Sequence, residues 1–108
     1  MKKSQYLAIA VALVAGSVQA MAQKGDAAKG KEVFEQCSVC HNADSAEAKM
    51  GPGLKGLYKA AKMKSTGKAP SDATVGGKID EGGGGMPAYK EMLSAPEKAN
   101  LLAYLKTL

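Results

Sequence analysis

All the cysteine and histidine side chains of this chain lie in one short segment. They are its strongest candidates for binding a metal or forming a covalent bond. Its only two cysteines and its only histidine lie within residues 37–41, which read Cys-Ser-Val-Cys-His. A structural disulfide between Cys37 and Cys40 is a poor interpretation, because closing so short a loop removes little entropy from the unfolded chain. A zinc site would need a fourth ligand, such as Asp44 or a group from a partner. A thioredoxin-like pair would need a βαβ setting, which the sequence does not supply.

The same spacing is the attachment signature of c-type haem. In a Cys-x-x-Cys-His motif, two thiols can each bond one vinyl group of the same porphyrin, and the adjacent histidine places an imidazole under the iron. Cys37 and Cys40 are therefore predicted to form the covalent links, and His41 is predicted to bind the iron. The predicted cofactor is one covalently attached haem c.

The composition fits a chain that needs such a cofactor. The 108 residues allow one domain, and aromatic residues make up only 5%, with no Trp and a single Phe. A core built from these side chains alone would be small, so the porphyrin would supply the missing apolar surface. All 15 basic residues are Lys. The absence of Arg argues against a nucleic-acid partner, because phosphate and guanine contacts depend on the guanidinium group.

Residues 1–22 have the layout of a secretory signal peptide. A basic start at residues 2–3 precedes an apolar run over residues 7–15, and small residues follow at Ala20 and Ala22. The apolar run is too short for a transmembrane helix, which needs about 20 apolar residues. The prediction is therefore a cleaved export signal.

Cleavage after Ala22, or after Ala20, would leave a single domain over residues 23–108. With cleavage after Ala22, 13 Lys and 10 acidic residues give the mature chain a net charge of +3 once Lys2 and Lys3 are removed. We expect this domain to be periplasmic and monomeric, without a membrane-spanning segment.

Helical periodicity and caps predict an all-α domain. Gly30 lies within the first predicted helix. Glycine in a helix interior is less stable than alanine by about 1 kcal/mol, so its presence suggests that another backbone crosses closely there. Ser94 and Glu97 form a capping box at the start of the last helix. Residues 65–85 are rich in glycine and are expected to form a loop held against something, with one or two helical turns inside it. The predicted helical segments are residues 26–36, 54–61, 74–79 and 94–108.

The second axial position of the iron has several candidate ligands. No other histidine exists, so the choices are a methionine, a lysine or no protein ligand. Met86 is favoured because four glycines precede it and Pro87 follows, so its backbone can approach a flat cofactor and is then stiffened. The other methionines are expected to pack in the interior or lie on the surface; they are Met50, Met63 and Met92.

The ordered set of motifs resembles the small bacterial class I c-type cytochromes. The resemblance covers residues 26–108 and is more specific than the haem signature alone. Its motifs are Gly30 and Phe34 before the signature, Gly-Pro-Gly-Leu at residues 51–54, Gly-Met-Pro-Ala-Tyr at residues 85–89, and a last helix with Leu101, Leu102, Tyr104 and Leu105.

This resemblance implies a cytochrome c fold, with about four short helices wrapped around the haem. The first and last helices would cross at a glycine and an aromatic residue. The Pro52 carbonyl would accept the ring N–H of His41, and Met86 would be the second axial ligand. Because Trp is absent, Tyr58 is a candidate partner for a haem propionate, with packing as its alternative role.

Ligation by His41 and Met86 leaves no open position for a substrate, which favours an electron carrier over an enzyme. The predicted function is one-electron transfer between respiratory or dehydrogenase complexes in the periplasm. One alternative is a gas-binding or sensory haem protein in which Met86 is displaced. Another is a dedicated cytochrome subunit of a single oxidoreductase complex.

Lysines in the segments expected to border the haem are candidates for docking acidic redox partners. Such a rim would steer fast encounters that salt weakens, whereas the alternative is an ordinary solvated surface. The candidates are Lys49, Lys55, Lys59, Lys62, Lys64 and Lys90.

Overall fold

A computed structural model describes residues 25–108, and the signal peptide predicted for residues 1–22 lies outside them. The described chain contains no β-strand, only an isolated bridge between Gly83 and Met86. Each helix within this part of the chain is too short or too polar to cross a membrane. The predicted all-α class is confirmed. The helices are α2 (Ala27–Phe34), the short 3-10 helix η1 (Leu57–Lys59), α3 (Asp72–Glu81) and α4 (Ala95–Leu105).

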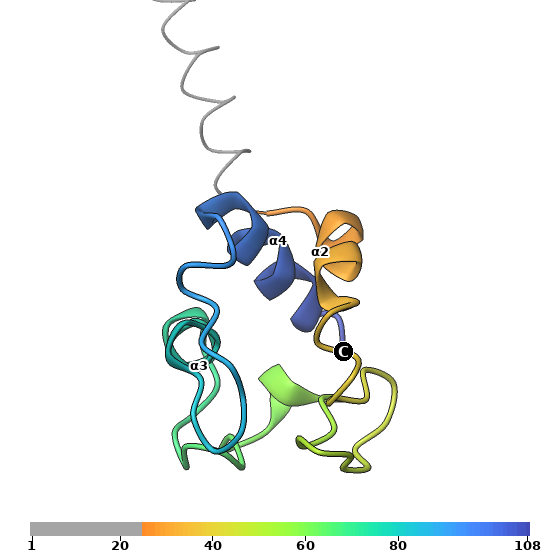
Figure 1. Ribbon diagram of the computed structural model, residues 1–108. Coiled ribbons are helices and arrows are strands. Elements are labelled where there is room, and N and C mark those ends of the chain that lie inside the picture. Colours follow the sequence, from red (N-terminus) through yellow and green to blue (C-terminus); the bar gives the residue numbers. More distant parts are fainter. Residues whose placement is uncertain (1–24) are drawn as a thin grey trace, which may run out of the picture.

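Helices α2 and α4 pack against each other at one end of the molecule (Figure 1). The Asp26 carboxylate caps α2 by accepting the backbone N–H groups of Ala28 and Lys29 at 2.9 and 3.2 Å. The Asp26 N–H itself donates to the Asn100 side chain in α4 at 2.8 Å. The start of α2 is therefore fixed both by its own cap and by α4.

Gly30 lies at the point where the two helices cross. A Cβ atom there would collide with the backbone carbonyl of Asn100 and would lie 2.8 Å from the Cβ of Tyr104. One turn later, the rings of Phe34 and Tyr104 pack 5.4 Å apart at an angle of 54°. The close backbone crossing predicted from Gly30, and the aromatic contact that the resemblance implies, are both confirmed.

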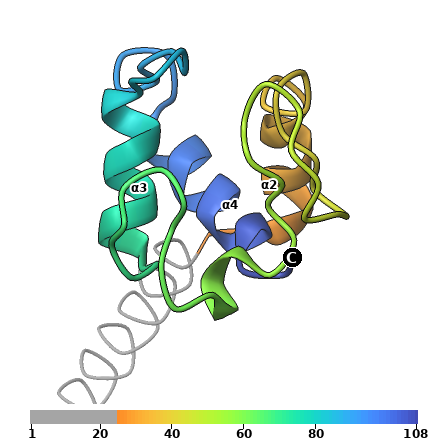
Figure 2. The same ribbon diagram turned by 90° about the horizontal axis from the view of Figure 1, so that it is seen from below.

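Helix α3 is longer than the one or two turns predicted for residues 74–79. The Ser71 hydroxyl accepts the N–H of Thr74 at 3.1 Å, and the Thr74 hydroxyl accepts the N–H of Ser71 at 2.9 Å. This reciprocal cap starts the helix despite two interior glycines. In Figure 2, α4 lies between α2 and α3.

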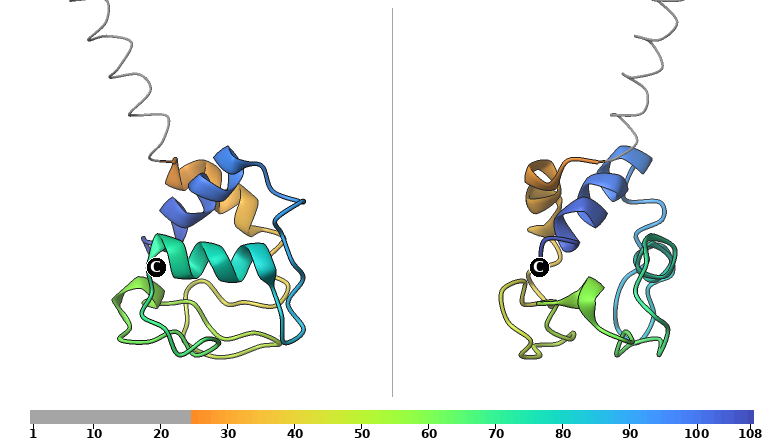
Figure 3. Two further views of the ribbon diagram at one scale, coloured as in Figure 1. Left: turned by 90° about the vertical axis from the view of Figure 1, so that its left-hand side faces the viewer. Right: turned by 180° about the vertical axis from the view of Figure 1, so that it is seen from behind.

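The helix predicted over residues 54–61 is wrong, and only η1 forms there. The Leu54 N–H donates to the carbonyl of Asn42 at 2.8 Å, and the Gly56 N–H donates to that of Leu108 at 3.0 Å. Gly56 also has a φ of 74°, which is incompatible with a continuous right-handed helix. Tertiary hydrogen bonds thus replace the local helix. Residues 40–70 run mostly as loops at the end of the molecule away from α2 and α4 (Figure 3).

The buried hydrophobic side chains come from all three α-helices and two loops. They are Phe34, Met63, Val75, Ile79, Tyr89, Leu101 and Leu105. All of them except Tyr89 also line one cleft. The hydrophobic core of the described chain is therefore largely the wall of this cleft.

Candidate haem-binding site

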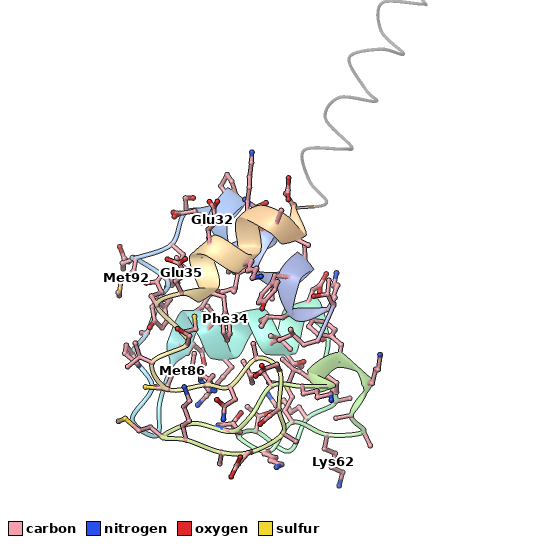
Figure 4. The ribbon with its side chains drawn as sticks, turned by 90° about the vertical axis from the view of Figure 1, so that its right-hand side faces the viewer. Glu32, Phe34, Glu35, Lys62, Met86 and Met92 are labelled. Atoms are coloured by element: carbon pink, nitrogen blue, oxygen red, sulfur yellow. The ribbon has the colours of Figure 1, made fainter. Side chains whose placement is uncertain are left out.

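The cleft has a volume of about 540 Å³, within the range of roughly 300–1,000 Å³ usual for cofactor sites. Helices α2, α3 and α4 contribute apolar side chains to it, and the loops on either side of η1 close the opposite wall. Phe34 and Met86, which both line the cleft, are labelled in Figure 4. The apolar walls suit a large flat cofactor.

Tight turns after α2 bring the signature residues to the cleft. The N–H of Cys37 donates to the carbonyl of Phe34 at 2.7 Å, and the N–H groups of Cys40 and His41 donate to that of Cys37 at 3.1 and 3.0 Å. Successive turns of this kind let Cys37, Cys40 and His41 all line the cleft. Both thiols are free, so they are available to bond a porphyrin.

The chemistry of these groups does not favour a redox-active thiol pair or a zinc site. Burial, followed by the proximity of Cys40, raises the pKa of the Cys37 thiol. Reactive thiol pairs have lowered pKa values, so the raised pKa of Cys37 gives no support to a redox-active pair. Among residues 25–108, no three His, Cys, Asp or Glu side chains are arranged to hold a metal ion directly. Two thiols and one imidazole on an apolar wall fit haem better than zinc.

The ring of His41 is held in one orientation by the loop that faces it. Its Nδ1 lies 2.8 Å from the carbonyl oxygen of Pro52, and because a carbonyl only accepts, Nδ1 must carry the proton. The lone pair is then on Nε2, the nitrogen left to bind a metal. Gly51 packs so closely on this ring that a Cβ atom would lie 2.8 Å from Nδ1. This geometry matches the contact that the resemblance implies for Pro52.

Met86 reaches the same cleft from a different part of the chain. The N–H of Gly83 donates to the carbonyl of Met86 at 2.9 Å, and the N–H of Met86 donates back to that of Gly83 at 3.2 Å. These two bonds close a tight turn after α3, and Pro87 follows it. The partly buried side chain of Met86 packs against the core. All five predicted site residues therefore line one cleft.

The other methionines of the described chain occupy different environments. Met63 is only 6% exposed and lines the cleft, and its sulfur lies 3.9 Å from the hydroxyl of Thr66. Met50 lines the outer edge of the cleft at 85% exposure, and its sulfur lies 4.0 Å from that of Cys40. Met92 is exposed and does not line the cleft. Met63 is thus an interior packing residue, one of the two roles expected for it.

Tyr58 does not line the cleft, and its hydroxyl is engaged outside it. Its hydroxyl donates to the Asp72 carboxylate at 3.0 Å, and Lys106 donates to the other oxygen of that carboxylate at 2.9 Å. Burial and this hydrogen bond raise the pKa of Tyr58. Tyr58 therefore joins η1 to the start of α3, which corresponds to its alternative role in packing.

The lysines expected to border the haem divide into two groups. Lys55, Lys62 and Lys64 line the cleft, whereas the other three candidates do not. Lys49 donates to the carbonyl of Ser38 at 3.1 Å. Lys78 also lines the cleft, and the sequence reasoning missed it because no local pattern distinguishes it from the other lysines.

Comparisons with known proteins agree with this site. The family model for cytochrome c matches residues 27–108. The chain is also 45% identical, over 62 residues, to cytochrome c2 of Blastochloris viridis. That match covers 56% of this chain and 47% of the relative, so the chain spans about half the length of the curated protein it matches. Because the family model covers most of the chain, including the whole cleft, the protein belongs to the cytochrome c family and carries covalently attached haem c.

Proposed function

We propose that this protein is a periplasmic one-electron carrier rather than an enzyme. In this proposal Cys37 and Cys40 hold the haem through thioether bonds, and His41 and Met86 are the axial ligands of its iron. The bound haem supplies a one-electron couple. The protein residues fix the ligands and exclude substrates from the iron.

The observation that carries the proposal is the convergence of two distant segments on one apolar cleft. The Nδ1–H of His41 donates to the carbonyl of Pro52, which orients the ring so that Nε2 can bind a metal. Met86 comes from the turn after α3 and lines the same cleft. A thioether opposite an imidazole stabilises ferrous iron and raises the reduction potential. With both axial positions filled by the protein, electron transfer needs little rearrangement.

The ligand assignment is tested by replacing Met86. The ferric protein should show the weak far-red absorption band of a sulfur-to-iron bond, and Met86→Ala should lose it. Without the thioether, the reduction potential of the variant should also fall. Both changes are measured on the purified haem-containing protein by absorption spectroscopy and redox titration.

Met63→Ala is the matched control, because Met63 lines the same cleft and is more deeply buried. It should keep the far-red band while losing stability, by about 2–5 kcal/mol for a buried methionine. Loss of the band in Met63→Ala with retention in Met86→Ala would overturn the assignment. Ready binding of carbon monoxide by the reduced wild-type protein would instead favour a gas-binding function.

An uneven charge distribution supports docking of acidic redox partners. Residues 49–71 carry six lysines and no acidic residue, whereas the rest of residues 25–108 carries six lysines and ten acidic residues. Lys62 projects from the end of the molecule opposite α2, whose surface carries Glu32 and Glu35 (Figure 4). Such a charge dipole would orient the basic end of the cleft toward a negative partner surface.

This docking surface is tested with the double variant Lys62→Glu and Lys64→Glu. Its electron exchange with an anionic iron–cyanide complex should be about three- to tenfold slower at low salt, and the difference should shrink as salt rises. Lys29→Glu with Lys31→Glu makes the same charge change on α2 and should have a smaller effect. Equal effects of the two double variants, or a rate independent of salt, would contradict the proposal.

Export rests on the signal layout of residues 1–22. Mass spectrometry of the protein from the periplasmic fraction should give a mature chain that begins at Gln23, or at Met21 if cleavage follows Ala20. An uncleaved chain in the cytoplasm would contradict the localisation.

A further inference from the structure

The segment between α3 and Met86 has unusual conformational freedom because it consists of glycine. Residues 82–85 are four consecutive glycines, and each has a positive φ, between 64° and 105°. Glycine adopts positive φ angles without a steric penalty, but it loses more conformational entropy on folding than any other residue. A single turn closed by Gly83 and Met86 would be a weak restraint on such a segment. Beyond Met86, the N–H of Tyr89 donates to the carbonyl of Ile79 at 2.9 Å, so an anchor before Met86 would hold the segment from both sides.

Lys78 supplies contacts that can serve as this anchor. From the last turn of α3, its ammonium group donates to the carbonyl of Gly82 at 3.0 Å and to that of Gly83 at 3.1 Å. The Gly83 carbonyl is the same oxygen that accepts the N–H of Met86 at 3.2 Å. One cation thus binds the atom that closes the Met86 turn and joins it to the rigid end of α3.

The physical setting makes these two contacts strong. Hydrogen bonds from an ammonium group are stronger than those between neutral groups, and a cation near a helix C-terminus interacts favourably with the helix dipole. Lys78 is only partly exposed and lines the cleft, so solvent competes less for its protons than at a surface lysine. Its ammonium is therefore well placed to hold the glycine segment.

We propose that Lys78 is a positioning residue for Met86, and that it keeps the thioether in place against competing ligands of the iron. The proposal rests on the proposed function, because it assumes that Met86 is an axial ligand. In it, Lys78 does not touch the iron. It acts by restricting the turn from which Met86 projects.

The test is the displacement of Met86 by added imidazole in the ferric haem-containing protein. Loss of the far-red band reports displacement and gives an apparent dissociation constant for imidazole. Lys78→Met keeps the length of the side chain but removes the donor. We expect it to bind imidazole about tenfold more tightly than the wild type, since losing one charge-assisted hydrogen bond suffices for that change. Lys78→Gln, which keeps a neutral donor, should fall between the two.

Lys98→Met is the matched control, because it removes the same charge from another partly exposed lysine in a 2.8 Å ion pair with Asp80. Lys98 does not line the cleft, so its variant should bind imidazole like the wild type even if it lowers the midpoint of unfolding. Equal imidazole affinities in the Lys78 variants and the wild type would overturn the role of Lys78. The same shift in Lys98→Met would overturn it as well. A wild-type protein without the far-red band would instead contradict the proposed function.

Discussion

The two ends of the molecule are held together in different ways. At the helical end, α2 and α4 contact each other directly through the crossing at Gly30 and through the rings of Phe34 and Tyr104. At the cleft end, α3 and the loops around η1 turn most of their apolar side chains toward the cleft. The first end is completed by the chain itself, whereas the second is completed by its cofactor.

This difference teaches how a small chain with few aromatic residues folds. Nearly all of its buried hydrophobic side chains are also cleft-lining, so the same residues serve as core and as binding wall. These side chains form one cluster, and a bound porphyrin would add a packing partner on the side that faces the cleft. We therefore expect cofactor attachment and folding of the cleft end to be coupled.

The largest effect is expected from preventing attachment with Cys37→Ser and Cys40→Ser together. The six buried side chains that line the cleft would lose their packing contacts with the porphyrin, and this loss would be a large part of the usual total stability of about 5–15 kcal/mol for a domain. Hydrogen exchange of the haem-free variant should show α3 and residues 41–71 unprotected, with any residual protection confined to α2 and α4. Wild-type protection of α3 in this variant would remove the distinction between the two ends.

A smaller but local loss is expected from Gly30→Ala at the helical end. The added methyl group would collide with the Asn100 carbonyl and crowd Tyr104, and neither backbone can yield without separating the helices. Overpacking usually costs about 1–3 kcal/mol, and we expect the upper part of this range because the obstacle is backbone. The free energy of unfolding, measured with denaturant, checks this value. An unchanged stability would mean that the crossing is looser than the structure has it.

The opposite sign is expected from Gly77→Ala in α3, which serves as the control for the previous variant. A Cβ atom at Gly77 would have nothing within 4 Å, and the residue lies in the interior of a helix. Replacing glycine by alanine at such a position stabilises a helix by about 0.5–1 kcal/mol. The same denaturant titration should show this gain. A loss of stability would indicate that the cleft end packs against α3 more tightly than we infer.

The parts of the fold that could be predicted are those coded by neighbouring residues. The cap at Asp26 and the capping box of Ser94 and Glu97 are local patterns, and both helices begin where these patterns predict. Helix α3 was underestimated because Gly76 and Gly77 lower its helix propensity, while its cap uses Thr74 instead of the usual Glu or Gln. Segment 54–61 has a helical pattern, but the backbone N–H groups of residues 54–56 donate to remote carbonyls. Tertiary hydrogen bonds of this kind leave no local pattern.

The candidate site follows the same division. The signature at residues 37–41 is a local motif, and the motifs around Pro52 and Met86 made those two residues predictable. Lys78 could not be found in this way, because its role depends on two backbone carbonyls that point back toward α3. The hydrogen bond from Tyr58 to Asp72 could not be predicted for the same reason, since only the structure brings the two residues together. Sequence patterns and the resemblance therefore indicated the proposed ligands and Pro52, but not the contacts that Lys78 and Tyr58 make.

The smallest effect is expected from Asp72→Asn. This variant weakens the hydrogen bonds from Tyr58 and Lys106 at the cleft end, which do not involve the haem. The hydrogen bond from Lys106 is the main cause that lowers the pKa of the Asp72 carboxyl, and the bond from Tyr58 adds to it. Because the folded-state pKa lies below the unfolded value, the carboxylate stabilises the fold fully at neutral pH. This contribution is lost as the pH falls through the folded-state pKa. The pair is exposed, so screening by solvent limits its contribution to about 0.5 kcal/mol.

Thermal unfolding should therefore show a slightly less stable variant at pH 7, and the difference from the wild type should shrink in acid and at high salt. A difference that stayed constant down to the acid limit of folding would mean that Asp72 stabilises the fold through packing rather than through its charge.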